Sequence, residues 1–261
     1  MVTRRRLVSS MVIGSLVQPA TLFAKGGRYF GVPDVDLQYP PLPEHGEGIL
    51  GVNPATADEE EAAAEILSRA PTGSTAFEVA NYFVSGQVPA KYLDQWPHTS
   101  SWNPLIVDFF TVAVTDVNVK NDLVPWCAAF ARWCLYRVIG DAALGSASSQ
   151  SFMKQGLAET AAPEIGDIAV FTAYRQDNGA DTGLGHVGFV ASKPSGDEFE
   201  VLGGNQSKTG DYSCICVSGF KKNNPMTRCL SVYKNGVCSK SRVNVNLRIN
   251  KFFKAPEKRN P

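Results

Sequence analysis

The spacing of apolar residues predicts helices in the first half of the chain and strands in much of the second. Runs of apolar residues at helical spacing are bounded by residues that start or stop helices. Thr75 and Glu78 form a capping box, and Gly86 ends the run that follows. Asn103 and Pro104 begin another helix in the same way. We expect helices over residues 58–70, 75–86, 103–114 and 126–139.

The run at 126–139 is apolar around almost its whole circumference. A helix of this kind must be buried on all sides, so we expect it at the centre of the domain. Asp122 is suited to cap this helix, which we prefer to a role as catalytic acid, and Pro125 fits its first turn. Gly140 ends it, and a loop with a short helix follows to about residue 156.

Strand patterns follow in the second half of the chain. Residues 167–173, 186–191 and 199–202 form three short apolar runs, and residues 243–249 alternate apolar with polar side chains. The turn residues at 193–197 predict an antiparallel hairpin between the second and third runs. Helices followed by an antiparallel sheet indicate an α+β domain.

The first 24 residues have the order of an export signal. Residues 4–6 are arginines, residues 7–23 are mostly apolar, and the small Ala24 follows. Residues 3–8 further resemble a twin-arginine signal. A membrane anchor is the alternative, but the stretch barely reaches spanning length and is interrupted by glycine and proline. We therefore expect a cleaved signal and a periplasmic or secreted protein.

Composition limits the partners of the mature protein. The 261 residues carry 25 basic and 25 acidic side chains, and cleavage after Ala24 leaves 22 basic against 25 acidic. No dense stripe of lysine and arginine is interleaved with aromatic residues, so nucleic acid is not an expected partner. No later stretch is apolar enough to span a bilayer, so no membrane association is expected after the signal is removed.

The six cysteines fall into two groups. Because exported proteins meet an oxidising compartment, the four in the C-terminal part predict two disulfides. Three connectivities are open, and the Cys214–Cys216 pair is the one that spacing makes least favourable. A metal site is the weaker interpretation, because the chain has three histidines and Cys-Ile-Cys lacks the gap of a zinc knuckle. The first group is Cys127 and Cys134, and the second is Cys214, Cys216, Cys229 and Cys238.

Cys127 is the candidate nucleophile. It lies in the first turn of the predicted central helix, where free amides and the helix dipole favour a thiolate. The alternative is a buried structural thiol, which is the role we assign to Cys134 one heptad later. Trp126, next to Cys127, is expected to pack in the core rather than to line a substrate groove.

His186 is the candidate base. His45 lies in a proline-rich segment and His98 in a loop, whereas His186 begins a predicted strand. Gly185 and Gly188 flank it, and their missing side chains suggest space for another molecule to approach. The alternative is a structural histidine at a strand edge.

Asn205 is the candidate third member of a catalytic triad. If the hairpin turn is centred between Ser195 and Gly196, Asn205 lies directly opposite His186, close enough to orient the imidazole. A slip of one residue would turn Asn205 to the other face, and it would then be only a turn residue after two glycines.

Four motifs in order resemble the CHAP family, the cysteine- and histidine-dependent amidohydrolases and peptidases related to NlpC-type cell-wall enzymes. The similarity runs from about residue 103 to 207. The motifs are Pro125-Trp126-Cys127-Ala128-Ala129-Phe130, Gly166-Asp167-Ile168-Ala169-Val170-Phe171, Gly185-His186-Val187-Gly188-Phe189-Val190 and Val201-Leu202-Gly203-Gly204-Asn205-Gln206.

The resemblance implies a papain-like fold with Cys127 as nucleophile, His186 as base and Asn205 as polar third member. It also implies peptidoglycan peptide as the substrate and no cofactor. Some members carry a glutamate two positions before the asparagine, where this chain has Gly203, and Glu200 is too far along to replace it. Calcium sites of some members cannot be placed here, so no metal ligand is predicted.

The expected organisation has four parts, with the CHAP-like part carrying the chemistry. We expect an exported hydrolase of wall peptides, either an endopeptidase or an N-acetylmuramoyl-L-alanine amidase. Another acyl transferase, or a non-catalytic module stabilised by disulfides, is the alternative. The cysteine-rich extension could select substrate, act as a lid or bind a protein inhibitor. The parts are a signal at 1–24, a Pro/Gly-rich strap at 25–57, helices at 58–102, and the CHAP-like domain at 103–261 with its extension from about 208.

Overall fold

A computed structural model describes residues 54–73, 75–96, 101–119, 122, 124–206, 213–234 and 237–257. The predicted export signal, almost all of the strap, His45 and His98 lie outside these residues. All described residues belong to the compact unit Gly31–Pro261.

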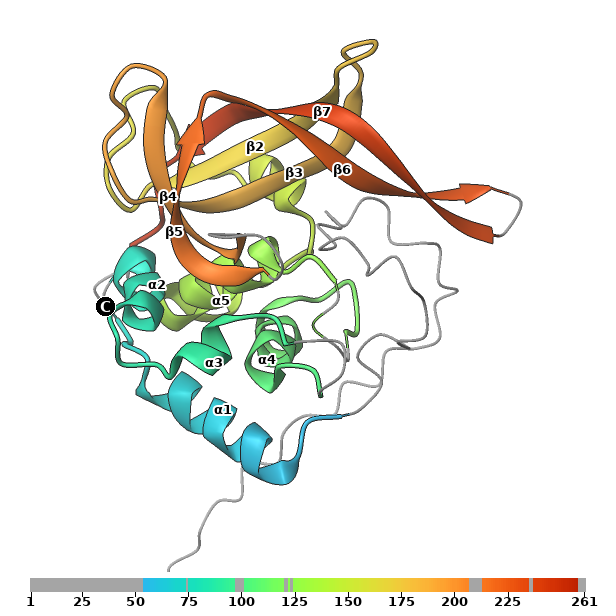
Figure 1. The fold of residues 1–261 in the computed structure, drawn as a ribbon. Helices are drawn as coiled ribbons and strands as arrows, with labels where there is room; N and C mark the ends of the chain where they lie inside the picture. The colour runs from blue at the N-terminus through green and yellow to red at the C-terminus, as the bar shows by residue number, and fades with distance from the viewer. Residues whose placement is uncertain are drawn as a thin grey trace, which may run out of the picture. The chain divides into compact units, whose positions relative to one another are not determined.

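In the described part of the chain, five α-helices precede the sheet, and they lie together on one side of it (Figure 1). Capping boxes at Thr56 and Thr75 begin the first two helices, and Asn103 caps the fourth. The four predicted helices are confirmed, and the short α3 is additional. The helices are α1 (Ala57–Arg69), α2 (Ala76–Val84), α3 (Ala90–Leu93), α4 (Pro104–Ala113) and α5 (Cys127–Ile139), followed by the 3₁₀ turns η1 (Gly140–Ala143) and η2 (Ser149–Lys154).

The described strands form an antiparallel sheet in the order β1-β7-β2-β3-β4-β5, with β6 paired to β7. The α+β prediction is thereby confirmed. Three strands, β1, β5 and β6, were not predicted: β1 has only two residues, and cysteines, serine and glycine interrupt the polar–apolar alternation around Ile215 and Val217 in β5. The strands are β1 (Glu159–Thr160), β2 (Ile168–Arg175), β3 (Asp181–Val190), β4 (Glu198–Gln206), β5 (Cys214–Lys221), β6 (Asn223–Lys234) and β7 (Val237–Phe253).

Helix α5 lies in the centre of the larger hydrophobic core, as its apolar circumference predicts. Trp126, Phe130 and Trp133 are buried there among side chains of α2, α4 and the helix-facing side of the sheet. Edge-to-face contacts join Phe130 to Phe83 and Phe109. A second core covers the opposite face of the sheet and includes Phe171 and Phe199. The two cores hold the sheet and α5 in a fixed relation.

The predicted cap on α5 is wrong. Trp126 occupies the N-cap position and makes no side-chain capping bond. Asp122 is instead buried, and its Oδ2 accepts hydrogen bonds from the backbone N–H groups of Trp96 and Asn103, both at 2.9 Å. Asp122 therefore ties the segment before α5 to two distant parts of the chain, a role that local sequence rules do not reveal.

Candidate active site

Cys127 is the first residue of α5, and its side chain is only 2% exposed. The N–H of Val187 in β3 donates a hydrogen bond to its thiol, as do the backbone N–H groups of Cys127 and Ala128. Val187 directly follows His186 along β3. The Cys127 thiol therefore contacts the strand residue that follows His186, and within the described residues no hydrogen bond joins it to the imidazole itself.

The position of the Cys127 sulfur follows from the direction of the backbone groups in β3. The N–H and carbonyl of Val190 bond to Asp167 and Gly166, on the β2 side. Because these directions alternate along a strand, the N–H of Val187 points towards β4. The recorded β3–β4 ladder has already ended there, since it covers only Phe189↔Leu202 and Val190↔Val201. The sulfur thus lies where β3 and β4 separate.

His186 leaves β3 on the face that carries Leu184 and Val190, and it is 4% exposed. Phe220 of β5 stacks on the imidazole with ring centroids 5.5 Å apart and an angle of 11°. Phe171 approaches from β2 with centroids 6.1 Å apart. These aromatic rings shield the imidazole from water, and burial lowers the pKa of His186 to about 4.

Burial also raises the pKa of the Cys127 thiol from 9.0 to about 11, more than the donated hydrogen bonds lower it. The sequence argument expects the opposite direction, because it weighs only the helix terminus. That expectation is wrong for the closed site described here, where loss of water costs the thiolate more than the helix start returns. At neutral pH the two groups are therefore a thiol and a neutral imidazole.

Gln206, which the sequence analysis did not select, contacts the base. Its amide lies 3.2 Å from Nε2 of His186. The Oε1 atom is assigned to this contact, because it then also accepts from the N–H of Gly203 at 3.1 Å. The amide nitrogen then donates to Ser218 Oγ at 3.0 Å and to the Cys216 carbonyl at 3.2 Å. In this arrangement His186 carries its proton on Nε2, and Nδ1 is left to accept one.

Comparison with known protein families gives one match, which covers the segment that contains Cys127 and His186. The family model of the CHAP domain matches residues 119–205. This segment is therefore similar to CHAP domains. The resemblance seen in the sequence motifs is thereby confirmed for this segment, which contains Cys127, His186 and Asn205 and ends one residue before Gln206. Curated proteins and solved structures give no match to the chain.

The end of the CHAP segment contains a bulge. The predicted hairpin register is confirmed, since Phe189 pairs with Leu202 as a turn between Ser195 and Gly196 requires. Beyond it, the β4–β5 register shifts between Gly203 and Gln206, and Asn205 has a positive φ of 58°. An extra residue in a strand turns the following side chains to new directions. Gln206 then contacts His186, and within the described part of the chain no hydrogen bond joins Asn205 to it.

The glycines beside His186 do not leave room for a second molecule. A Cβ on Gly188 would lie 2.5 Å from Val201 Cγ1 and 2.9 Å from the Leu202 carbonyl. A Cβ on Gly185 would collide with the Phe171 carbonyl and the Gln150 amide. These positions of the CHAP domain are small because neighbouring segments of the same chain fill the space, which corrects the sequence-based interpretation.

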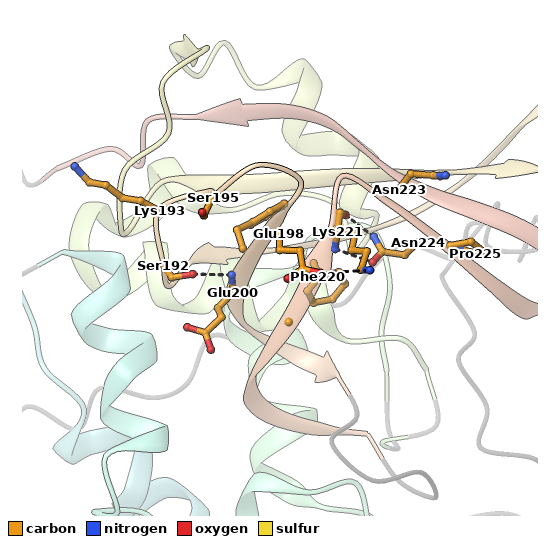
Figure 2. Close-up of a pocket in the computed structure, with 12 residues that line it drawn as sticks. Ser192, Lys193, Ser195, Glu198, Glu200, Phe220, Lys221, Asn223, Asn224 and Pro225 are labelled. Atoms are coloured by element: carbon orange, nitrogen blue, oxygen red, sulfur yellow. Dashed lines mark hydrogen bonds and ion pairs between the residues drawn. The ribbon is translucent and has the colours of Figure 1, made fainter.

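A cavity of about 670 Å³ lies close to the base, at the turn end of β4 and β5 (Figure 2). Phe220 lines this cavity and also stacks on His186, so one aromatic ring connects the two. Glu198 and Lys221 form an ion pair of 3.3 Å on its wall, and Ser192 Oγ accepts from the N–H of Glu200 at 2.9 Å. A mixed-charge hollow thus adjoins the aromatic ring that covers His186.

Metal and membrane features were also sought in the described ranges. These contain no group of three or more His, Cys, Asp or Glu side chains that could hold a metal ion. Over the same ranges, every helix is too short or too polar to cross a bilayer.

Proposed function

We propose that this protein is an exported peptidoglycan hydrolase that cleaves an amide bond of wall peptides with Cys127 and His186. The CHAP match indicates amidase or peptidase activity on peptidoglycan. The observation that carries the residue assignment is the hydrogen bond from Val187 to the Cys127 thiol, which puts the sulfur beside the residue that follows His186. A structural thiol would need no histidine at that place.

The proposed reaction is acyl transfer to Cys127. Nδ1 of His186 takes the thiol proton as the sulfur attacks the amide carbonyl, and the backbone N–H groups at the start of α5 stabilise the oxyanion. The imidazolium then protonates the leaving amine, which leaves a thioester. Water, deprotonated by His186, hydrolyses the thioester and returns the thiol.

A neutral resting pair is compatible with this reaction. The proton transfer and the attack occur together, so a stable thiolate is not required before substrate binds. Because Cys127 and His186 are both buried, substrate must displace covering groups, and Phe220 is the ring that covers the imidazole. The cavity beside Phe220 is the proposed approach for the peptide.

Digestion of purified peptidoglycan tests the function. The protein beginning at residue 25 is incubated with peptidoglycan, and the soluble products are identified by mass spectrometry. New amino termini within the peptides are expected for an endopeptidase, and free stem peptides for an amidase. An added amine acceptor distinguishes hydrolysis from acyl transfer, because a transferase would attach the amine to the product.

Variants of Gln206 and Asn205 identify the group that orients His186. Gln206→Ala leaves the buried Nε2–H without its partner, at a cost of about 1–3 kcal/mol, which lowers hydrolysis roughly 5- to 150-fold. Asn205→Gly removes the side chain while favouring the positive φ, so activity is expected to stay within about twofold. Steady-state rates of peptide release measure both. The reverse order of effects would restore the role that the family resemblance gives to Asn205.

Alkylation of Cys127 is expected to be slow at pH 7 and to rise about tenfold per pH unit towards pH 11, because the thiolate is the reactive form. Trypsin places Cys127 and Cys134 in different peptides, so mass spectrometry follows each separately. Cys134 is the matched control, since burial raises the pKa of its thiol well above the ordinary value. Rapid labelling of Cys127 at pH 7 would contradict the neutral pair.

A further inference from the structure

Cys214 and Cys216 bring two sulfur atoms together on one face of β5. Their Sγ atoms lie 3.0 Å apart, and the side chains are 8% and 2% exposed. Residues two apart in a strand share a face, and their Cα atoms are about 6.6 Å apart, within the range that a disulfide spans. To reach bond length, roughly 2.04 Å, the sulfurs must approach by about 1 Å, and the Cβ atoms must reach a separation of about 3.5–4.5 Å, so the oxidised pair requires β5 to bend at Ile215. The spacing along the sequence made this pair the least favourable of the possible disulfides, whereas the structure places its two sulfur atoms side by side.

The other two cysteines of the extension are not placed to pair with each other. In the β6–β7 register, Cys229 lies opposite Arg242, and Cys238 lies opposite Tyr233. The two cysteines are thus four ladder positions apart, which is about 13 Å along the hairpin. A direct bridge between them would exceed the Cα separation of a disulfide.

We propose that Cys214 and Cys216 form a thiol–disulfide couple within β5. A disulfide oxidant such as oxidised glutathione accepts two electrons from the pair. One thiolate attacks the oxidant and releases the first glutathione thiol. The second cysteine sulfur then displaces the other glutathione, so two protons and two electrons leave the protein and one S–S bond forms.

The couple is connected to the base by hydrogen bonds. Cys216 Sγ lies 3.4 Å from Ser218 Oγ, and Ser218 Oγ and the Cys216 carbonyl both accept from the Gln206 amide that holds His186. In the described sheet order, β5 is the last strand and is laddered to β4, and on its outer side at Cys214 it pairs with Asp94 through an isolated bridge rather than with another strand. Edge strands open more readily than central ones. Because a disulfide restricts the 214–216 segment, the oxidised form keeps Gln206 in place at temperatures where the reduced form loses it. This coupling rests on the proposed function, whereas the bond itself does not.

Peptide mapping of the full mature chain tests the bond without any activity assay. The protein is equilibrated with oxidised glutathione, alkylated, and digested with trypsin. Cys214 and Cys216 stay together in peptide 209–221, while Cys229 and Cys238 fall in peptides 229–234 and 235–240. We expect peptide 209–221 to lose two hydrogens and resist alkylation until dithiothreitol is added. Cross-links from it to either other peptide, or full alkylation before reduction, would overturn the proposal.

Thermal inactivation tests the coupling. Dithiothreitol is expected to lower the temperature of half-inactivation of the wild type and of a Cys229→Ser/Cys238→Ser control. It should leave Cys214→Ser/Cys216→Ser unchanged. If dithiothreitol lowers the inactivation temperature of all three proteins equally, the disulfide is not coupled to the active site, even if peptide mapping finds the bond. If peptidoglycan is not a substrate, the hydrogen exchange of β5 amides in oxidised and reduced protein supplies the same comparison.

Discussion

His186→Gln is expected to lower hydrolysis of wall peptides about 10²- to 10⁴-fold, because it removes the group that takes and returns the proton. The same change should make the protein less sensitive to acid. The folded protein binds a proton at His186 only near pH 4, whereas the unfolded chain binds it near 6.5. Wild-type stability therefore falls between pH 6.5 and 4, by about 3 kcal/mol in total. The His186→Gln variant has no imidazole at this position, so it should not lose this part of its stability at low pH.

Urea unfolding at pH 7 and pH 4 measures the difference between wild type and His186→Gln. Other groups titrate in this window, including Asp108, whose pKa burial raises to about 6. They contribute equally to both proteins, so the difference between the two pH dependences isolates His186. Identical pH dependence would mean that the imidazole is not buried in solution as the fold requires.

Gly204→Ala is expected to destabilise the protein by about 1–3 kcal/mol, because overpacking a filled core forces neighbours to move. A Cβ at Gly204 would lie 2.6 Å from Trp126 Cε3 and 2.8 Å from Phe130 Cβ. Both neighbours are fully buried in the larger core, and Trp126 directly precedes the nucleophile. Displacing Trp126 moves the start of α5, so hydrolysis should fall as well.

Gly219→Ala is the matched control, since Gly219 lies in β5 of the same sheet and a Cβ there meets nothing within 4 Å. Its free energy of unfolding should stay within about 0.5 kcal/mol of the wild type. Urea denaturation of both variants gives the comparison. Equal effects would mean that the tight approach of β4 to α5 does not constrain Gly204.

Local signals carried most of the fold prediction. The capping box at Thr75, the apolar circumference of α5 and the turn residues at 193–197 are short-range features, and the structure agrees with each. The register of the β3–β4 hairpin followed from the turn alone. The capping role predicted for Asp122 was wrong, because the groups that it binds, on Trp96 and Asn103, are 26 and 19 residues away along the chain.

The candidate site was less accessible to sequence reasoning. Cys127 and His186 could be proposed from the sequence because a cysteine at a helix start and a histidine at a strand are local patterns. Gln206 was missed because the bulge at Asn205 adds a residue that register counting does not see. The direction of the Cys127 pKa was missed because desolvation depends on the whole fold around the sulfur.

The central claim is that Cys127 and His186 act as one catalytic unit on wall peptides. The most direct test is the rate of peptide release from purified peptidoglycan by the wild type, Cys127→Ala, His186→Gln and the double variant. Members of one unit are not additive, so the double variant should lose no more than Cys127→Ala alone. Release by Cys127→Ala at the wild-type rate, or no release by any of the four proteins, would contradict the account.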